Sequence, residues 1–172
     1  SGVMLAKLGC RYVLVGHSER RELHGEDDAL VNRKVHAAVK HGIVPILCVG
    51  EGLTVREAGR HVEHTTAQLL AGLEKVSSQH AQTLVVAYEP VWAIGTGKTA
   101  TPADASSVHK VIRDELFKLC GSNEDSTLIP ILYGGSVKAD NAEALFAEAE
   151  LDGALVGGAS LKPETFLPIV RA

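Results

Sequence analysis

The sequence predicts an α/β protein with a parallel sheet, and two observations lead to this prediction. Five short apolar segments recur along the 172 residues, and each ends in glycine or in a polar cluster. Amphipathic segments with helical spacing lie between them. Alternation of strand and helix is typical of parallel strands joined by right-handed crossovers. No linker or low-complexity stretch divides the sequence, so we expect one domain over residues 1–172.

The five apolar segments are expected to form the strands. Continuous apolar runs this short suit strands that are buried on both faces, as in a parallel sheet. The expected strands are Tyr12–Val15, Val44–Val49, Leu84–Tyr88, Ile129–Tyr133 and Gly153–Val156.

The intervening segments carry helix signals. Val31 and Val35 fall on one face at helical spacing, and Thr101 followed by Pro102 is a typical helix start. A short helix is expected to begin near Ser18, whereas Ser77–Gln79 and Gly121–Ser126 are expected to be loops. The other expected helices are Ser1–Leu8, closed by Gly9, then Asp28–Lys40, Val55–Lys75, one that begins at Pro102, Ala139–Ala147 and Pro163–Val170.

Composition and charge argue against several classes of protein. The chain is 45% hydrophobic and 22% charged, and 17 basic against 21 acidic residues give a net charge of −4. A nucleic-acid-binding surface is therefore not expected, and no apolar run is long enough to cross a membrane. The three cysteines are scattered and no signal segment opens the sequence, so we expect a reduced, cytoplasmic protein.

Glycines follow most of the expected strands, where functional residues of parallel α/β folds lie. Periodicity alone does not distinguish an open doubly wound sheet from a (β/α)8 barrel. Gly134-Gly135-Ser136 and Gly157-Gly158 follow two consecutive late strands, the place where barrel enzymes commonly bind phosphate. Glycine allows backbone N–H groups to approach an anion closely. The alternative is that these glycines only form tight turns.

Glu89 and His17 are the candidate acid–base residues at the strand ends. Glu89 closes an apolar strand, where burial can raise the pKa of a carboxyl group toward the working pH of a general base. The alternative for Glu89 is a surface loop residue. His17 precedes the short helix expected near Ser18, and a helix N-terminus disfavours the charged imidazolium. A neutral His17 could donate a hydrogen bond, and the alternative is a structural histidine.

Other sequence patterns are better explained without a catalytic or ligand-binding role. Gly97-Lys98-Thr99 is similar to the end of a phosphate-binding P-loop, but Trp92 stands where that motif needs its first glycine. The G-x-G-x-x-A pattern at residues 95–100 does not lie in the tight strand–turn–helix that a dinucleotide site requires. His61, Glu63 and His64 are expected to lie on a solvated helix face and not to bind a metal. Cys48 lies in an apolar strand and is expected to be a core residue.

Five strings of residues resemble triosephosphate isomerases. AYEPVWAIGTGKTATP at residues 87–102 resembles that family's catalytic strand and hinged lid loop, and VGHSERR at residues 15–21 resembles the strand of its electrophile. CVGE at residues 48–51, LYGGSV at 132–137 and DGALVGGASL at 152–161 match as well, in the same order. The resemblance extends over essentially the whole chain. It implies a (β/α)8 barrel, of which five consecutive strand–helix units are present.

The resemblance implies a role for each matching residue. Glu89 would be the base that moves a proton between C1 and C2 of a triose phosphate, and His17 the neutral electrophile; such pKa tuning in this enzyme is well characterised. Ser18 and Glu19 would support them, and residues 90–100 would form the lid, whose closure excludes water. Residues that would bind the phosphate group are Gly95, Ser136, Gly157 and Gly158, and those that would latch the lid are Tyr133 and Ser136.

The resemblance also implies what this sequence lacks. The family's barrel has eight strands and about 250 residues, and this chain is expected to supply strands four to eight. The family's substrate-binding Asn and Lys and its dimer-interface loop match no position here, so we expect the chain alone to be inactive. In the family the enzyme is a cytoplasmic homodimer of glycolysis and gluconeogenesis that uses no metal or organic cofactor.

The sequence is also compatible with two other functional classes. A non-catalytic, phosphate-binding remnant of the barrel is expected to tolerate loss of its base, yet Glu89, His17 and the lid string are all present. Another phosphate-binding barrel or an open nucleotide-binding sheet would not require the lid string or the His17 context. These residues therefore favour the isomerase interpretation.

Overall fold

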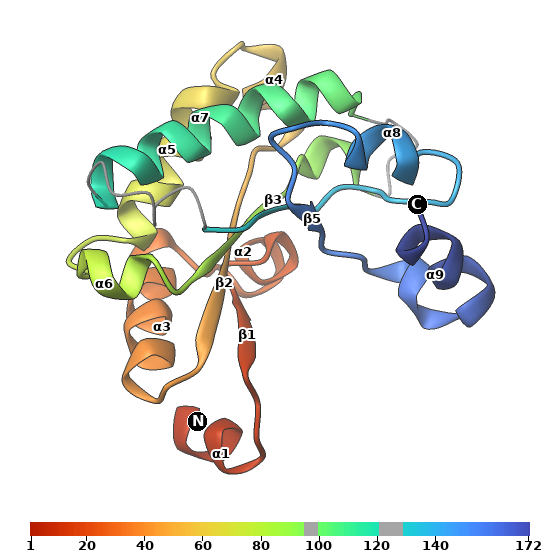
Figure 1. The fold of residues 1–172 in the computed structure, drawn as a ribbon. Coiled ribbons are helices and arrows are strands. Elements are labelled where there is room, and N and C mark those ends of the chain that lie inside the picture. The colour runs from red at the N-terminus through yellow and green to blue at the C-terminus, as the bar shows by residue number, and fades with distance from the viewer. Residues whose placement is uncertain (95–99, 121–128) are drawn as a thin grey trace.

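Five parallel strands form the sheet. The computed structural model describes residues 1–94, 100–120 and 129–172, and within them the strand order is β1-β2-β3-β4-β5 (Figure 1). Every neighbouring pair is parallel, with Tyr12 opposite Val44 and Tyr88 opposite Tyr133. The α/β class is therefore confirmed. The strands are β1 Tyr12–Val15, β2 Val44–Val49, β3 Val85–Tyr88, β4 Ile131–Tyr133 and β5 Gly153–Ala154.

Helices precede, connect and follow the strands. The helix α3 begins where Asp27 caps it, its carboxylate accepting a hydrogen bond from the Leu30 N–H at 2.7 Å. Single 3-10 turns span Val91–Ala93 and Gly158–Leu161. The α-helices are α1 Gly2–Lys7, α2 Ser18–His24, α3 Asp28–Lys40, α4 Leu53–Glu57, α5 His61–Gly72, α6 Ser78–Ala81, α7 Pro102–Cys120, α8 Ala142–Phe146 and α9 Pro163–Val170.

Two expectations about the helices were wrong. The single helix expected over Val55–Lys75 is divided into α4 and α5, because Gly59 adopts a left-handed conformation with φ of +69° between them. The expected loop at Ser77–Gln79 is instead the start of α6, where the Ser77 hydroxyl accepts a hydrogen bond from the His80 N–H. The loop expected at Gly121–Ser126 lies outside the described residues.

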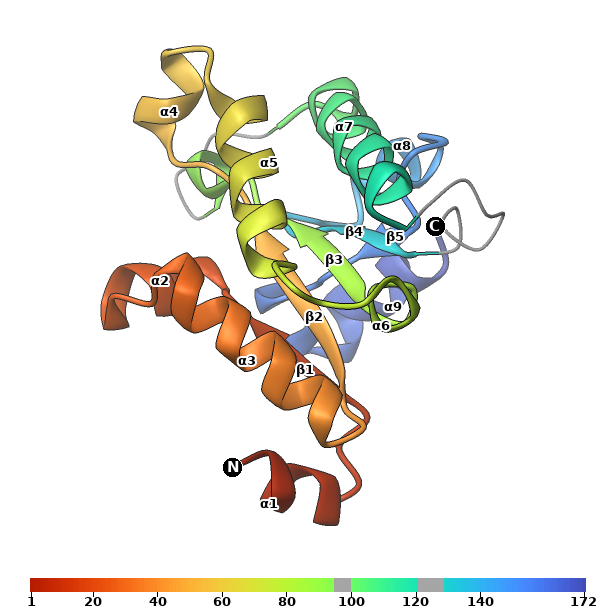
Figure 2. The same ribbon diagram turned by 90° about the vertical axis from the view of Figure 1, so that its left-hand side faces the viewer.

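The helices α3, α5 and α7 pack along one side of the sheet (Figure 2). Val35 of α3, Leu69 of α5 and Ile112 of α7 are buried there against strand residues. All four residues of β3, in the middle of the sheet, are buried as expected. The core is therefore centred between β3 and these three helices.

Strand β1 is not buried on both faces, contrary to expectation. Val15 is buried, whereas Tyr12 and Leu14 are 57% and 45% exposed. Successive side chains of a strand point to opposite faces, so Tyr12 and Leu14 lie on the face that α3 does not cover. The strand also stands at one end of the strand order, with β2 as its partner. In the described part of the chain, no helix is both long and apolar enough to cross a membrane.

His109 of α7 links the stability of the fold to pH. The imidazole is fully buried, its Nδ1 lies 3.2 Å from the Glu150 carbonyl oxygen, and its ring packs edge-on against Tyr88. Its Nε2 is buried and has no hydrogen-bond partner among the described residues. Burial lowers the pKa of His109 to about 4 from its usual 6.5, so the neutral ring is the folded form.

We expect the protein to lose about 2 kcal/mol of stability between about pH 7 and about pH 5 through His109. As the pH falls through the usual histidine value, the unfolded chain binds a proton that the folded chain does not, so unfolding is favoured. Urea denaturation at several pH values measures this slope. His109→Gln, which keeps a donor toward the Glu150 carbonyl, is expected to flatten it, and an unchanged slope in this variant would contradict the assignment.

Candidate functional site

A cavity of about 520 Å³ opens at the carboxyl edge of the sheet. It is lined by Leu14 of β1, by residues that follow β1, β4 and β5, and by Ile94 from the segment after β3. The carboxyl ends of parallel strands meet at this edge, which is where ligands bind in such folds. The cavity brings together the predicted site residues His17, Glu19, Ser136, Gly157 and Gly158.

Glu89 is held beside this cavity by the backbone at the end of β3. Its N–H donates to the Val49 carbonyl oxygen at 2.8 Å, and the residue is 2% exposed. Two glycines of the neighbouring strand ends leave room for it. A Cβ on Gly50 would lie 1.8 Å from the Glu89 carbonyl oxygen, and one on Gly134 would lie 3.0 Å from the Glu89 Cγ.

Three groups contact the Glu89 carboxylate. The His17 Nε2 lies 3.0 Å from Oε1, the Ser18 N–H donates to Oε2 at 3.0 Å, and the Ser18 hydroxyl donates to Oε1 at 3.2 Å. Burial raises the pKa of Glu89 above its ordinary value, against the opposing effects of His17, the Ser18 hydrogen bonds and Arg21. A carboxyl group whose pKa is raised in this way is suited to act as a general base.

His17 has a defined tautomer. It is the N-cap of α2, and its Nδ1 accepts a hydrogen bond from the Glu19 N–H at 3.3 Å. A nitrogen that accepts a hydrogen bond carries no proton, so the proton of the neutral ring is on Nε2, the atom that faces Glu89. Glu19 thus orients His17 through its backbone, while its side chain is exposed and lines the cavity.

The comparisons with known proteins identify the family of this chain. A protein-family model described as triosephosphate isomerase matches residues 1–172. The chain belongs to the triosephosphate isomerase family. It is 57% identical to the triosephosphate isomerase of Streptomyces coelicolor over 171 residues, which cover 99% of this chain and 66% of that protein. It is 58% identical to that of Saccharopolyspora erythraea over 166 residues, which cover 96% of this chain and 63% of that protein.

This chain spans about two thirds of the length of those relatives. Within that span, the sequential order of the five parallel strands is that of consecutive units of the family's (β/α)8 barrel. The barrel architecture that the resemblance implied is therefore confirmed at the level of the family, with five of its strands present in the described residues.

Three of the four residues expected to bind phosphate lie on two loops. Ser136 follows β4, and its carbonyl oxygen accepts a hydrogen bond from the Asn141 side-chain amide at 3.0 Å. Gly157 and Gly158 follow β5, and a Cβ added to either would have no atom within 4 Å, so their backbone is open to the cavity. Gly95, the fourth expected residue, lies outside the described residues.

Tyr133, the expected lid latch, ends β4 with its ring buried. A Cβ on Gly135 would lie 2.2 Å from the Tyr133 hydroxyl and 2.9 Å from Pro90, so ring and lid start are close neighbours. The hydroxyl is buried and has no hydrogen-bond partner within the described ranges. Burial raises the pKa of Tyr133 to about 12, so the hydroxyl stays protonated and is a donor.

A buried carboxylate that sequence reasoning did not assign anchors the start of the segment that is expected to form the lid. Glu51, after β2, is fully buried and accepts hydrogen bonds from the Tyr88 hydroxyl at 3.1 Å and the Trp92 Nε1–H at 2.8 Å. The guanidinium of Arg56 lies 5.1 Å from the centre of the Trp92 ring, within reach of a cation–π interaction.

Arg56 also reaches the far end of the same segment. Its Nη2 donates to Asp104 at 2.5 Å, and the other oxygen of Asp104 accepts from the Thr101 N–H at 3.1 Å. The Thr101 hydrogen bonds hold the pKa of Asp104 below its ordinary value. Arg56 therefore connects the two ends of residues 90–101. The sequence signals for Glu51 were its place two residues after a strand end and its position in the CVGE string at residues 48–51.

The remaining sequence patterns that fall on described residues do not form a second site. Among the described residues, no group of three or more potential ligands could hold a metal ion, so His61, Glu63 and His64 stay a helix face. Cys48 is fully buried, and burial raises the pKa of its thiol. The Gly97-Lys98-Thr99 and G-x-G-x-x-A patterns fall on residues 95–99, which lie outside the described residues, and on Ala100.

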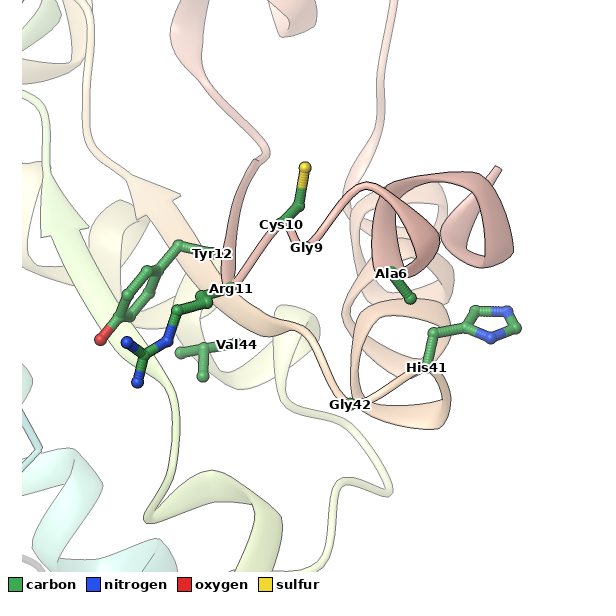
Figure 3. A pocket seen from close by; sticks show the side chains of 8 residues that line it. All are labelled: Ala6, Gly9, Cys10, Arg11, Tyr12, His41, Gly42 and Val44. Carbon is green, nitrogen blue, oxygen red and sulfur yellow. The ribbon is translucent and has the colours of Figure 1, made fainter.

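A hollow of about 460 Å³ lies at the opposite edge of the sheet, before β1 and β2. Figure 3 shows that its polar side chains diverge: Arg11 and Tyr12 extend to one side, His41 to the other, and Cys10 away from both. A binding site typically has a few polar groups that point toward the same space. The polar side chains of this hollow do not, so we assign it no binding role.

Proposed function

We propose that this chain carries the reaction centre of triosephosphate isomerase, which interconverts dihydroxyacetone phosphate and D-glyceraldehyde 3-phosphate in glycolysis and gluconeogenesis. One observation supports the proposal above all. The buried Glu89 carboxylate lies 3.0 Å from the Nε2 of His17, beside a cavity lined by Ser136, Gly157 and Gly158. A base, a neutral hydrogen-bond donor and a glycine-rich anion cradle are what this isomerisation requires.

In the proposed reaction, Glu89 removes a proton from the carbon beside the substrate carbonyl. The Nε2–H of His17 donates a hydrogen bond to the carbonyl oxygen and stabilises the enediolate as its charge develops. A proton then passes between the two substrate oxygens through His17, which gives its Nε2 proton to the former carbonyl oxygen and takes the proton of the neighbouring hydroxyl. The carboxyl group of Glu89 returns its own proton to the neighbouring carbon as the new carbonyl forms there, so aldose and ketose interconvert with no net gain or loss of protons or electrons. The carboxylate must first leave Ser18 and His17, which it contacts in the present structure.

The lid is proposed to comprise residues 90–100. Its closure excludes water, so the enediolate phosphate is protected until the proton returns. Tyr133 and Ser136 are proposed to latch it, and Gly95 to add a backbone donor to the phosphate. The Tyr133 hydroxyl is buried near Pro90 and has no hydrogen-bond partner among the described residues, which supports the latch role.

The proposal extends to the compartment, oligomeric state and ligands that the family resemblance implies. The enzyme would act in the cytoplasm as a homodimer, with residues 1–172 forming a single domain that supplies strands four to eight of the barrel. It would bind a triose phosphate without nucleic acid, membrane, metal or organic cofactor. The closeness of the relatives, 57% and 58% identical, supports this.

Exchange with deuterated water tests the proposed reaction. A polypeptide that contains residues 1–172 and has the full length of the relatives is incubated with dihydroxyacetone phosphate in deuterium oxide. Deuterium is expected to enter the carbon beside the carbonyl while D-glyceraldehyde 3-phosphate forms. Binding of the phosphate ester without exchange would contradict the proposal and identify a non-catalytic, phosphate-binding barrel.

His17→Asn is expected to lower kcat/KM about a hundredfold, since one positioned donor to a developing oxyanion contributes about that much. Asparagine is a good N-cap residue, so α2 is kept, but its shorter amide does not reach the position of Nε2. The coupled isomerase assay measures the loss, and circular dichroism checks the fold. Unchanged kcat/KM would remove His17 from the reaction.

A further inference from the structure

The cavity at the carboxyl edge has a basic residue for which the proposed reaction gives no role. Of the described residues that line this cavity, only Lys138 is a lysine or an arginine. It follows Ser136 by two positions in the loop after β4, and it is exposed. No carboxylate within the described ranges lies at ion-pair distance from its ammonium group.

The backbone of Lys138 is fixed relative to the expected phosphate-binding loop. Its N–H donates to the Asn141 side-chain oxygen at 2.8 Å, and the Asn141 amide donates in turn to the Ser136 carbonyl oxygen at 3.0 Å. These two bonds close residues 136–141 into one turn. The backbone of Lys138 is therefore held at the rim of the cavity, two residues after Ser136, and its exposed side chain extends from that point.

The charge around the cavity makes this position significant. Glu19 lines the same cavity, Glu89 lies behind the lining in contact with His17, and the whole chain has a net charge of −4. An anionic ligand therefore approaches against acidic groups. A cleft that carries one cation at its mouth focuses the local field and raises the local concentration of an anion.

We propose that Lys138 is a rim cation that draws a phosphate dianion toward Ser136, Gly157 and Gly158 and strengthens its binding there. The inference rests on the proposed function, because it assumes that the ligand carries a phosphate group. Lys138 acts here through its charge at the cavity mouth, as a positioning residue, and takes no part in proton transfer. Its effect is consequently sensitive to salt, as interactions of exposed charges are.

Titration with sn-glycerol 3-phosphate, followed calorimetrically at about 20 mM and about 200 mM salt, tests this inference. At low salt, Lys138→Gln is expected to weaken binding roughly three- to fivefold and Lys138→Glu roughly tenfold, with most of the difference lost at high salt. Lys138→Arg is expected to bind as the parent does. Lys110→Gln is the matched control, since it removes the same charge from an exposed position on α7.

The outcomes separate the inference from the proposed function. Equal binding by the parent and by both Lys138→Gln and Lys138→Glu would overturn the rim-cation role and leave the phosphate site intact. A loss in Lys138→Gln that Lys110→Gln matches would also overturn it, since net charge would then be the cause. A parent that does not bind the phosphate ester at either salt concentration would overturn the proposed function and this inference with it.

Discussion

Glu89→Gln is expected to lower kcat for isomerisation at least about a thousandfold, because the amide cannot accept the substrate proton. The change is nearly isosteric. The Ser18 N–H, which donates to Oε2 at 3.0 Å, can donate to the amide oxygen after the side chain flips. Affinity for sn-glycerol 3-phosphate is expected to stay within about twofold, since Ser136, Gly157 and Gly158 are untouched.

The control for this variant is Glu74→Gln, which removes a carboxylate that is 66% exposed after α5. It is expected to leave both kcat and stability as in the parent, because exposed ion pairs contribute little. A Glu89→Gln variant that kept its rate would show that another group removes the proton. Loss of phosphate-ester binding together with rate would show that Glu89 holds the cavity in shape.

The sequence predicted the elements whose signals are local. Helix α3 has the expected bounds because Asp27 caps it and Val31 and Val35 fall on one face, and α9 begins at Pro163 as expected. Strands β1 and β2 also have the expected bounds. The break at Gly59 was missed because one glycine in a helical pattern is often tolerated, and only packing decides whether the chain turns there.

For the candidate site, the sequence predicted the individual residues but not the contacts between them. Position at a strand end identified Glu89 and His17 separately, and the resemblance assigned them complementary roles. Their contact could not be derived from a local pattern, because His17 follows β1, Glu89 follows β3, and the two meet only through the register of the strands. Glu51 was missed for the same reason: its partners Tyr88 and Trp92 lie on another strand end.

Gly50→Ala is expected to destabilise the protein by more than about 4 kcal/mol, the range of severe core clashes. Its Cβ would lie 1.8 Å from the Glu89 carbonyl oxygen and 2.6 Å from the carbonyl carbon, both backbone atoms. Neither side can yield easily, because the Gly50 N–H donates to Gln68 and the Glu89 N–H donates to Val49, each at 2.8 Å. Urea denaturation measures the loss as a lower midpoint.

Gly52→Ala, two residues further along, is the matched control. A Cβ there meets no atom within 4 Å, and the residue has an ordinary φ of −81° as the N-cap of α4, so a cost within about 1 kcal/mol is expected. In the fraction of Gly50→Ala that folds, β3 must move away from β2 at Glu89. A displacement of about 1 Å at the base is enough to cost about a hundredfold in rate. Equal stability of the two variants would mean that the end of β3 is not held against β2, and that the position of Glu89 is set by Ser18 and His17 instead.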